Sequence, residues 1–80
     1  MIIGKVVGTV VSTKKNELLT GSKFLTVEYT ENGTKTTVVA VDGVGAGIGE
    51  EVLVTMGSSA RLALFNKETP TDAVVVGIVD

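Results

Sequence analysis

Glycine occupies every second position from Gly43 to Gly49, a spacing that suggests a phosphate-binding loop. Such loops use glycine because backbone N–H groups must approach the anion closely. A dinucleotide-binding fingerprint starting at Gly43 needs a glycine at position 48, and one starting at Gly45 needs a glycine at position 50. The sequence has Ile48 and Glu50 there, and the P-loop lysine is also missing. We therefore favour a structural turn, with a ligand-binding loop as the alternative.

Three carboxylates border this segment: Asp42, Glu50 and Glu51. A magnesium or calcium site needs several oxygen ligands that converge at suitable spacing, and this spacing does not supply them. An aspartate before a glycine is typical of a turn, so we interpret Asp42 as a turn former. For Glu50 we expect a solvated side chain or one paired with a basic group. No metal, cofactor or acid–base chemistry is predicted here.

Ser58 and Ser59 lie close to Arg61, the sole arginine, and resemble a nucleophile beside an anion clamp. The chain has no histidine to act as the base, so we favour helix capping ahead of a short helix over residues 60–65. The arginine's fixed donors suit carbonyls or a carboxylate across an interface, and an ordinary surface position is equally compatible with the sequence.

In a small oligonucleotide-binding (OB) barrel, single-stranded nucleic acid often binds at the positions that Lys14, Lys15 and Lys23 would occupy. Such sites also need aromatic side chains for base stacking. The only aromatic residues are Phe24, Tyr29 and Phe65; we place Tyr29 in the core and Phe65 under the short helix. The net charge of −2 also argues against a nucleic-acid surface, so solvated loops are the favoured interpretation.

The elements that position these residues must form one small domain, because the chain has 80 residues. A chain this small usually needs disulfides, a metal or a partner subunit. Cysteine and histidine are both absent, so we expect oligomerisation. No apolar run approaches the ~20 residues that span a membrane, and the N-terminus lacks the features of a secretory signal. We expect a soluble intracellular protein.

Valine, threonine and isoleucine make up 30 of the 80 residues, which favours strands. Strands are predicted at about 2–11, 24–30, 34–41, 51–56 and 73–79. Asn32-Gly33 predicts a type I′ hairpin turn that pairs residue 25 with 40, 27 with 38 and 29 with 36. With long, glycine-containing strands and one short helix, the pattern predicts an all-β, OB-like closed barrel of five to six strands.

Two outward surfaces of this barrel are predicted to be apolar. In the predicted hairpin register, Phe24 lies opposite Val41, and Val39 lies beside them on the face away from the core. The last strand is apolar on both faces, and we interpret its second face as a contact with another subunit. Val75 and Ile78 are the interface candidates on this strand.

Three ordered motifs carry a resemblance to a known family. They are Val39-Ala40-Val41-Asp42-Gly43-Val44-Gly45-Ala46-Gly47-Ile48-Gly49-Glu50, Gly57-Ser58-Ser59-Ala60-Arg61 and Asp72-Ala73-Val74-Val75-Val76-Gly77-Ile78-Val79-Asp80. With the N-terminal Gly8-Thr9-Val10-Val11-Ser12-Thr13-Lys14-Lys15, they make the whole chain resemble the EutN/CcmL family, the pentameric vertex proteins of bacterial microcompartment shells.

The resemblance implies a single-domain structural protein, not an enzyme, that forms homopentamers at the five-fold vertices of a shell built mainly from hexamer-forming proteins. It implies location in the bacterial cytoplasm, within the shell, with no nucleic acid or membrane as partner. The candidate subunit-interface residues are Phe24, Val39, Val41, Arg61, Val75 and Ile78. By analogy, Gly45, Gly47, Gly57, Ser58 and Ser59 lie in loops at the axis or at subunit boundaries. The alternative is an OB-fold module that binds single-stranded nucleic acid.

Overall fold

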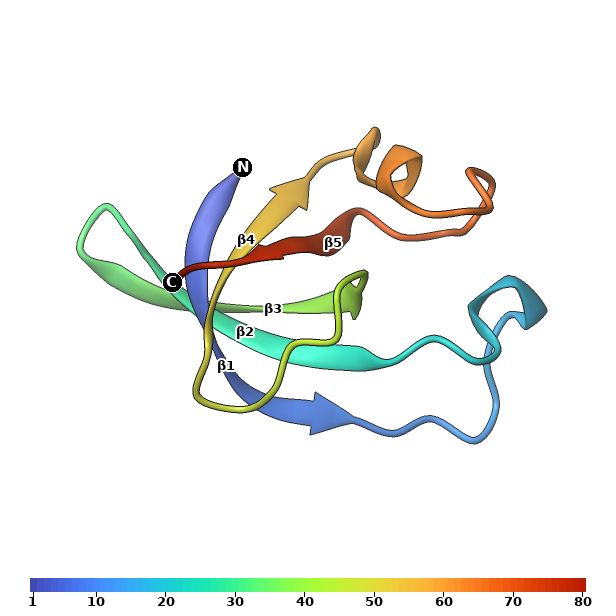
Figure 1. The fold of residues 1–80 in the computed structure, drawn as a ribbon, viewed down its shortest axis with the longest axis horizontal. Coiled ribbons are helices and arrows are strands. Elements are labelled where there is room, and N and C mark those ends of the chain that lie inside the picture. Colours follow the sequence, from blue (N-terminus) through green and yellow to red (C-terminus); the bar gives the residue numbers. More distant parts are fainter.

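The computed structural model describes all 80 residues and shows a closed five-stranded barrel (Figure 1). The strands are β1 (Ile2–Val10), β2 (Phe24–Glu31), β3 (Thr34–Asp42), β4 (Glu51–Met56) and β5 (Ala73–Ile78). Their order around the barrel is β1-β2-β3-β5-β4, and β1 closes the barrel by pairing with both β2 and β4. Only β3 and β5 are parallel. The predicted fold class is confirmed.

The β2–β3 hairpin has the predicted register along its whole length, from Phe24 opposite Val41 to Glu31 opposite Thr34. Asn32 and Gly33 have φ angles of 51° and 77°, the positive values that a type I′ turn requires. In Figure 1 the tip of this hairpin projects beyond the rest of the barrel. The register fixes which side chains of β2 and β3 face inward.

A glycine allows the strongly bent β1 to approach β2 closely. A Cβ atom at Gly4 would lie 2.5 Å from Cγ1 of Val27 and 2.9 Å from the carbonyl oxygen of Glu28, so no larger residue fits there. A register shift between Val6 and Gly8 bends the strand further. The expectation that glycines in the first strand permit sharp coiling is met at Gly4.

Two apolar clusters lie on opposite sides of the sheet. The main core fills the barrel with nine buried residues: Val6, Leu25, Val27, Ala40, Ala46, Val52, Val54, Ala73 and Val75. The second cluster lies outside the barrel, where Ala60 covers Val41 and Val74. The second face of β5 is thus partly covered by the chain's own turn, which corrects the expectation that another subunit must cover that face.

The predicted helix over residues 60–65 is wrong. The structure has single 3-10 turns, η1 (Glu17–Leu19) and η2 (Ala60–Ala63), and no α-helix. Ser59 precedes η2 with φ −92° and makes no side-chain capping hydrogen bond. An isolated α-helix of about six residues is marginal, and η2 buries only Ala60. No helix is long or apolar enough to cross a membrane.

Candidate functional site

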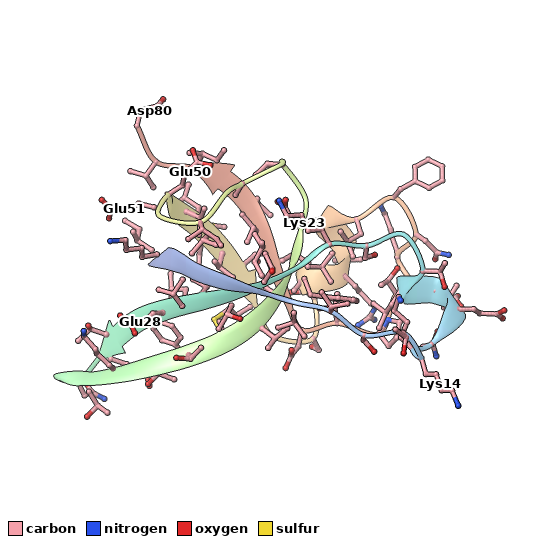
Figure 2. All side chains as sticks on the ribbon, turned by 90° about the horizontal axis from the view of Figure 1, so that it is seen from below. Lys14, Lys23, Glu28, Glu50, Glu51 and Asp80 are labelled. Atoms are coloured by element: carbon pink, nitrogen blue, oxygen red, sulfur yellow. The ribbon has the colours of Figure 1, made fainter.

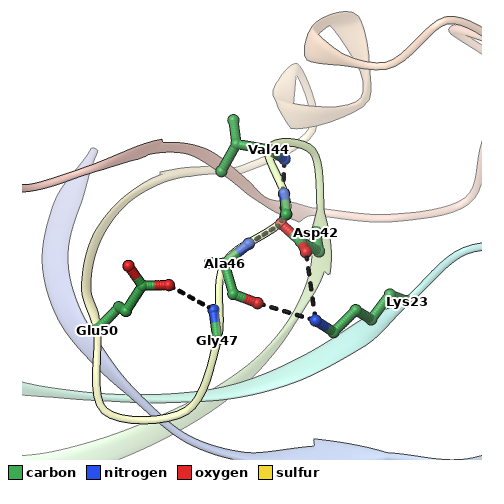
Figure 3. A network of polar contacts seen from close by, with 7 residues as sticks. Lys23, Asp42, Val44, Ala46, Gly47 and Glu50 are labelled. Atoms are coloured by element: carbon green, nitrogen blue, oxygen red, sulfur yellow. Dashed lines mark hydrogen bonds and ion pairs between the residues drawn. The ribbon is translucent and has the colours of Figure 1, made fainter.

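The glycine-containing loop between β3 and β4 folds around the side chain of Asp42. Its Oδ1 accepts hydrogen bonds from the backbone N–H groups of Val44, Gly45 and Ala46 at 3.1, 3.0 and 3.3 Å (Figure 3). The Asp42 side chain is only 3% exposed. This arrangement confirms that Asp42 is a turn former.

Two further side chains complete this network. The Nζ of Lys23 donates to the Ala46 carbonyl oxygen at 2.9 Å and lies 3.9 Å from Oδ2 of Asp42 (Figure 3). Oε1 of Glu50 accepts from the Gly47 N–H at 2.7 Å. Glu50 is exposed to solvent, as expected, and binds a backbone N–H group instead of a basic side chain. Because carboxylates already occupy the N–H groups that a phosphate would need, the geometry favours the structural turn over the ligand loop.

The two glycines of this loop that were predicted at the axis or at subunit boundaries differ in exposure. Gly45 is exposed with φ 84°, a conformation that favours glycine, whereas Gly47 is half-buried beside Glu50. Gly43 makes the close approach to β5, since a Cβ there would lie 2.7 Å from the Val75 carbonyl oxygen. The loop is therefore anchored to the barrel wall as well as to its own carboxylates.

The Gly57–Arg61 segment is held by backbone hydrogen bonds and has no comparable network of side-chain acceptors. Gly57 has φ 95° and its N–H donates to the Asp72 carbonyl oxygen at 2.8 Å. Arg61 donates through Nη1 to the carbonyl oxygen of Ser58, and its guanidinium makes no other hydrogen bond within the chain. Ser58, Ser59 and Arg61 are exposed. The two hydroxyls and most guanidinium donors are thus free to bind groups outside the chain.

The predicted interface residues divide by burial. Val39 is 51% exposed and Ile78 37%, and Phe24 is half-buried. Val75 lies fully buried in the barrel core, and Val41 is buried under Ala60. Val75 has no free surface for a partner, so its placement as an interface residue is corrected, whereas Val41, at 4% exposure, still lines a groove with Phe24 and Val39. The pattern of a two-sided apolar strand did not distinguish an internal cover from an external one.

Other exposed apolar residues were missed from the sequence. Phe65 was expected to pack under the short helix, but it is fully exposed at 105%. Ile3 and Leu62 are 58% and 56% exposed. Tyr29, expected in the core, is half-buried and belongs to neither apolar cluster. Strand alternation could have indicated that Ile3 faces outward. Its neighbours Ile2 and Gly4 both pair with inward-facing valines of β4, so the residue between them points the other way.

Only two of the three lysines share a groove: Lys15 and Lys23 line a hollow of about 250 Å³ together with Phe24. Lys23 is held by the glycine-containing loop, and Nζ of Lys15 donates to the Ser12 carbonyl oxygen at 2.6 Å. The side chain of Lys14 makes no hydrogen bond, and Lys14 lies at the end of the molecule opposite Glu50, Glu51 and Asp80 (Figure 2). Acidic residues form no group of three that could hold a metal ion.

Comparison with known proteins decides the family. A model described as "Ethanolamine utilisation protein EutN/carboxysome" matches residues 1–80. The chain belongs to the EutN/CcmL family. It is 54% identical to the microcompartment shell vertex protein GrpN of Rhodospirillum rubrum, over 100% of this chain and 93% of that protein. It is 45% identical to the carboxysome shell vertex protein CcmL of Gloeobacter violaceus, covering 100% and 83%.

Solved structures in this EutN/CcmL family share the fold of the chain. The structure described as the GrpN pentameric microcompartment shell protein from Rhodospirillum rubrum has a TM-score of 0.85 and 54% identity, with 100% of this chain and 94% of that chain covered. The CcmL structure from Gloeobacter violaceus has a TM-score of 0.89 and 46% identity, covering 100% and 86%. These relatives are structural shell proteins, and none of the names indicates an enzyme or a nucleic-acid-binding protein.

Proposed function

We propose that this chain is a structural protein of a bacterial microcompartment shell, located within the cell, where it forms cyclic pentamers that cap the five-fold vertices. The observation that carries this proposal is the full-length similarity to shell vertex proteins, including a 54% identical relative solved as a pentamer. We further propose that the ring contacts hexamer-forming shell proteins and binds neither nucleic acid nor membrane.

The surface of the isolated chain supports an assembling protein. Its accessible area is 5011 Å², whereas surface scaling gives ~4,500 Å² for a monomer of this mass. Thirteen large apolar side chains are exposed, although the barrel core is complete without them. A lone subunit therefore leaves apolar surface in water that contact with identical copies can bury.

Within the ring, we assign the subunit contact to Phe24, Val39, Arg61 and Ile78. Phe24 and Val39 belong to the outward face of the hairpin, and Arg61 has donors left free by its own turn. The loops containing Gly45, Gly47, Gly57, Ser58 and Ser59 are assigned to subunit boundaries or the axis. The exposed hydroxyls of Ser58 and Ser59 suit a polar opening.

Native mass spectrometry tests the assembly. We expect a discrete pentamer at micromolar concentration; a stable monomer or dimer contradicts the proposal. Val39→Asp is expected to shift the distribution toward monomer because it places a carboxylate on the apolar hairpin face. Lys15→Asp is the matched control on an exposed loop and is expected to leave the pentamer intact. Val75→Asp is unsuitable as a probe, because it buries a charge in the core.

A fluorescence anisotropy titration against single-stranded oligonucleotides at low salt tests the alternative. The shell protein is expected to give no signal, whereas an OB-fold binding module would give an affinity that falls with salt. Mixing the ring with a hexamer-forming shell protein of the same source tests the shell contact. We expect closed particles in electron micrographs only when both proteins are present.

A further inference from the structure

Two different apolar faces lie on separate strand pairs of the barrel. On the β1–β4 pair, Ile3 lies opposite Leu53 and points outward, while the residues beside it face the core. On the β2–β3 pair, Val39 lies opposite Thr26, next to Phe24. The two pairs share no strand, so these faces point in different directions from the barrel.

Each face has an apolar centre and a charged border. Ile3 is 58% exposed and Met1 77%, and the next outward pair on β1–β4 is Lys5 opposite Glu51. On β2–β3, the apolar part gives way toward the hairpin tip to the ion pair of Lys35 with Glu28, at 3.6 Å. An apolar centre with a polar border is typical of protein–protein interfaces.

The β2–β3 face is also hollowed. A groove of about 230 Å³ lies between η1, the hairpin and the segment that leads into β5. It is lined mainly by apolar side chains, among them Leu19, Phe24, Val39 and Pro70. The β1–β4 face borders a wider hollow of about 420 Å³, in which exposed Ile3 lies among mainly polar residues. The β2–β3 groove is therefore the more apolar of the two and can receive an exposed apolar side chain such as Ile3.

A ring with five members constrains how such faces are used. A two-fold contact joins the same patch of two subunits and closes at a dimer, so an odd-numbered ring requires contacts between two different patches. A standard contact buries ~800 Å² per partner, so two contacts would bury ~1,600 Å² of each subunit. That is about a third of the 5011 Å² that the lone chain exposes.

We infer that the β1–β4 face of one subunit, centred on Ile3, packs into the groove of the β2–β3 face, centred on Val39, of the next copy. This inference rests on the proposed function and adds which two surfaces meet around the ring. The occupant of both faces is a second copy of this chain, and the same contact repeats five times.

The absence of cysteine makes the test direct, because every thiol is an introduced one. Ile3→Cys, Val39→Cys and Glu31→Cys are made singly, with exposed Glu31 near the hairpin tip as control. Native mass spectrometry first establishes that each variant forms the ring. In the ring, we expect maleimide to label Ile3→Cys and Val39→Cys at least tenfold more slowly than Glu31→Cys.

A second arm identifies the pairing. Under mild oxidation or with a short bifunctional maleimide, the Ile3→Cys/Val39→Cys double variant is expected to give a ladder up to a covalent pentamer. Each single variant is expected to stay monomeric on a denaturing gel. Fast labelling of either face in an intact ring overturns the inference, as does cross-linking of a single variant. Protection that arises only after a hexamer-forming shell protein is added reassigns the face to that partner. If neither the chain nor its variants form a ring, the proposed function itself is overturned.

Discussion

Two loops rich in small residues differ in how their polar groups are satisfied. In the loop from Asp42 to Glu50, three backbone N–H groups bind one buried carboxylate, a fourth binds Glu50, and Lys23 holds a carbonyl oxygen. In the turn from Gly57 to Arg61, no side chain caps η2 and both serine hydroxyls are free. The first loop is complete within one chain, whereas the second still has polar groups to offer.

This difference separates two meanings of a glycine- and serine-rich motif. Backbone groups whose hydrogen-bond partners lie within the same chain contribute to the stability of the subunit. Substituting those partners should therefore lower the free energy of unfolding. Side chains that have no partner within the chain are available to a neighbour, and their substitution should affect the assembly more than the subunit. Substitutions in the two loops therefore test whether the division holds.

The largest effect is expected for Asp42→Ala. The substitution leaves three loop N–H groups without their acceptor and removes the partner of Lys23, at a cost on the order of 3 kcal/mol. Chemical denaturation at fixed protein concentration measures the loss, since ring formation makes stability concentration-dependent. Asp42→Asn keeps an oxygen in place of Oδ1 and is expected to lose about half as much. An unchanged midpoint for Asp42→Ala would show that the network is dispensable.

Gly57→Ala is expected to cost about 2 kcal/mol, because the φ of 95° is strained for any residue with a Cβ atom. Open space surrounds the position, so the cost is conformational and not steric. Gly47→Ala is the matched control: that glycine has no positive φ, and its added Cβ would make only ordinary contact with Glu50. Thermal unfolding should therefore separate the two alanine variants by several degrees.

The sequence predicts the barrel and the hairpin well because both depend on local signals. Asn32-Gly33 determines the turn, the turn determines the register, and alternation then assigns Leu25, Val27 and Ala40 to the core. Asp42 was also predictable, because an aspartate can bind the backbone N–H groups that directly follow it. Such contacts lie within a few residues of one another.

Contacts between distant segments could not be predicted in the same way. Val75 and Val41 are apolar, as interface residues often are. Only the three-dimensional structure shows that the closed barrel buries Val75 and that η2 covers Val41. Lys23 binds Ala46 across 23 positions, which no spacing rule indicates. Phe65 is apolar, yet the single-turn η2 has no face left to cover it.

Lys23→Met is expected to cost about 1 kcal/mol, because it removes one charge-assisted hydrogen bond and a half-exposed ion pair. Methionine keeps much of the apolar stem, so the change reports on the Nζ group. Lys14→Met is the matched control, since the side chain of Lys14 makes no hydrogen bond or ion pair. Equal unfolding midpoints for the two variants would mean that the contacts of Lys23 do not stabilise the loop.

The smallest effect on the subunit is expected for Ser59→Ala. Its side chain makes no capping bond, so its loss should change the free energy of unfolding by less than about 0.5 kcal/mol. The ring gives a separate readout, because dilution followed by native mass spectrometry measures subunit dissociation and not unfolding. Weaker assembly with unchanged subunit stability would place the hydroxyl at a subunit boundary, as proposed. A loss of subunit stability comparable to that of Asp42→Ala would instead abolish the distinction between the two loops, because Ser59 would then bind within its own chain.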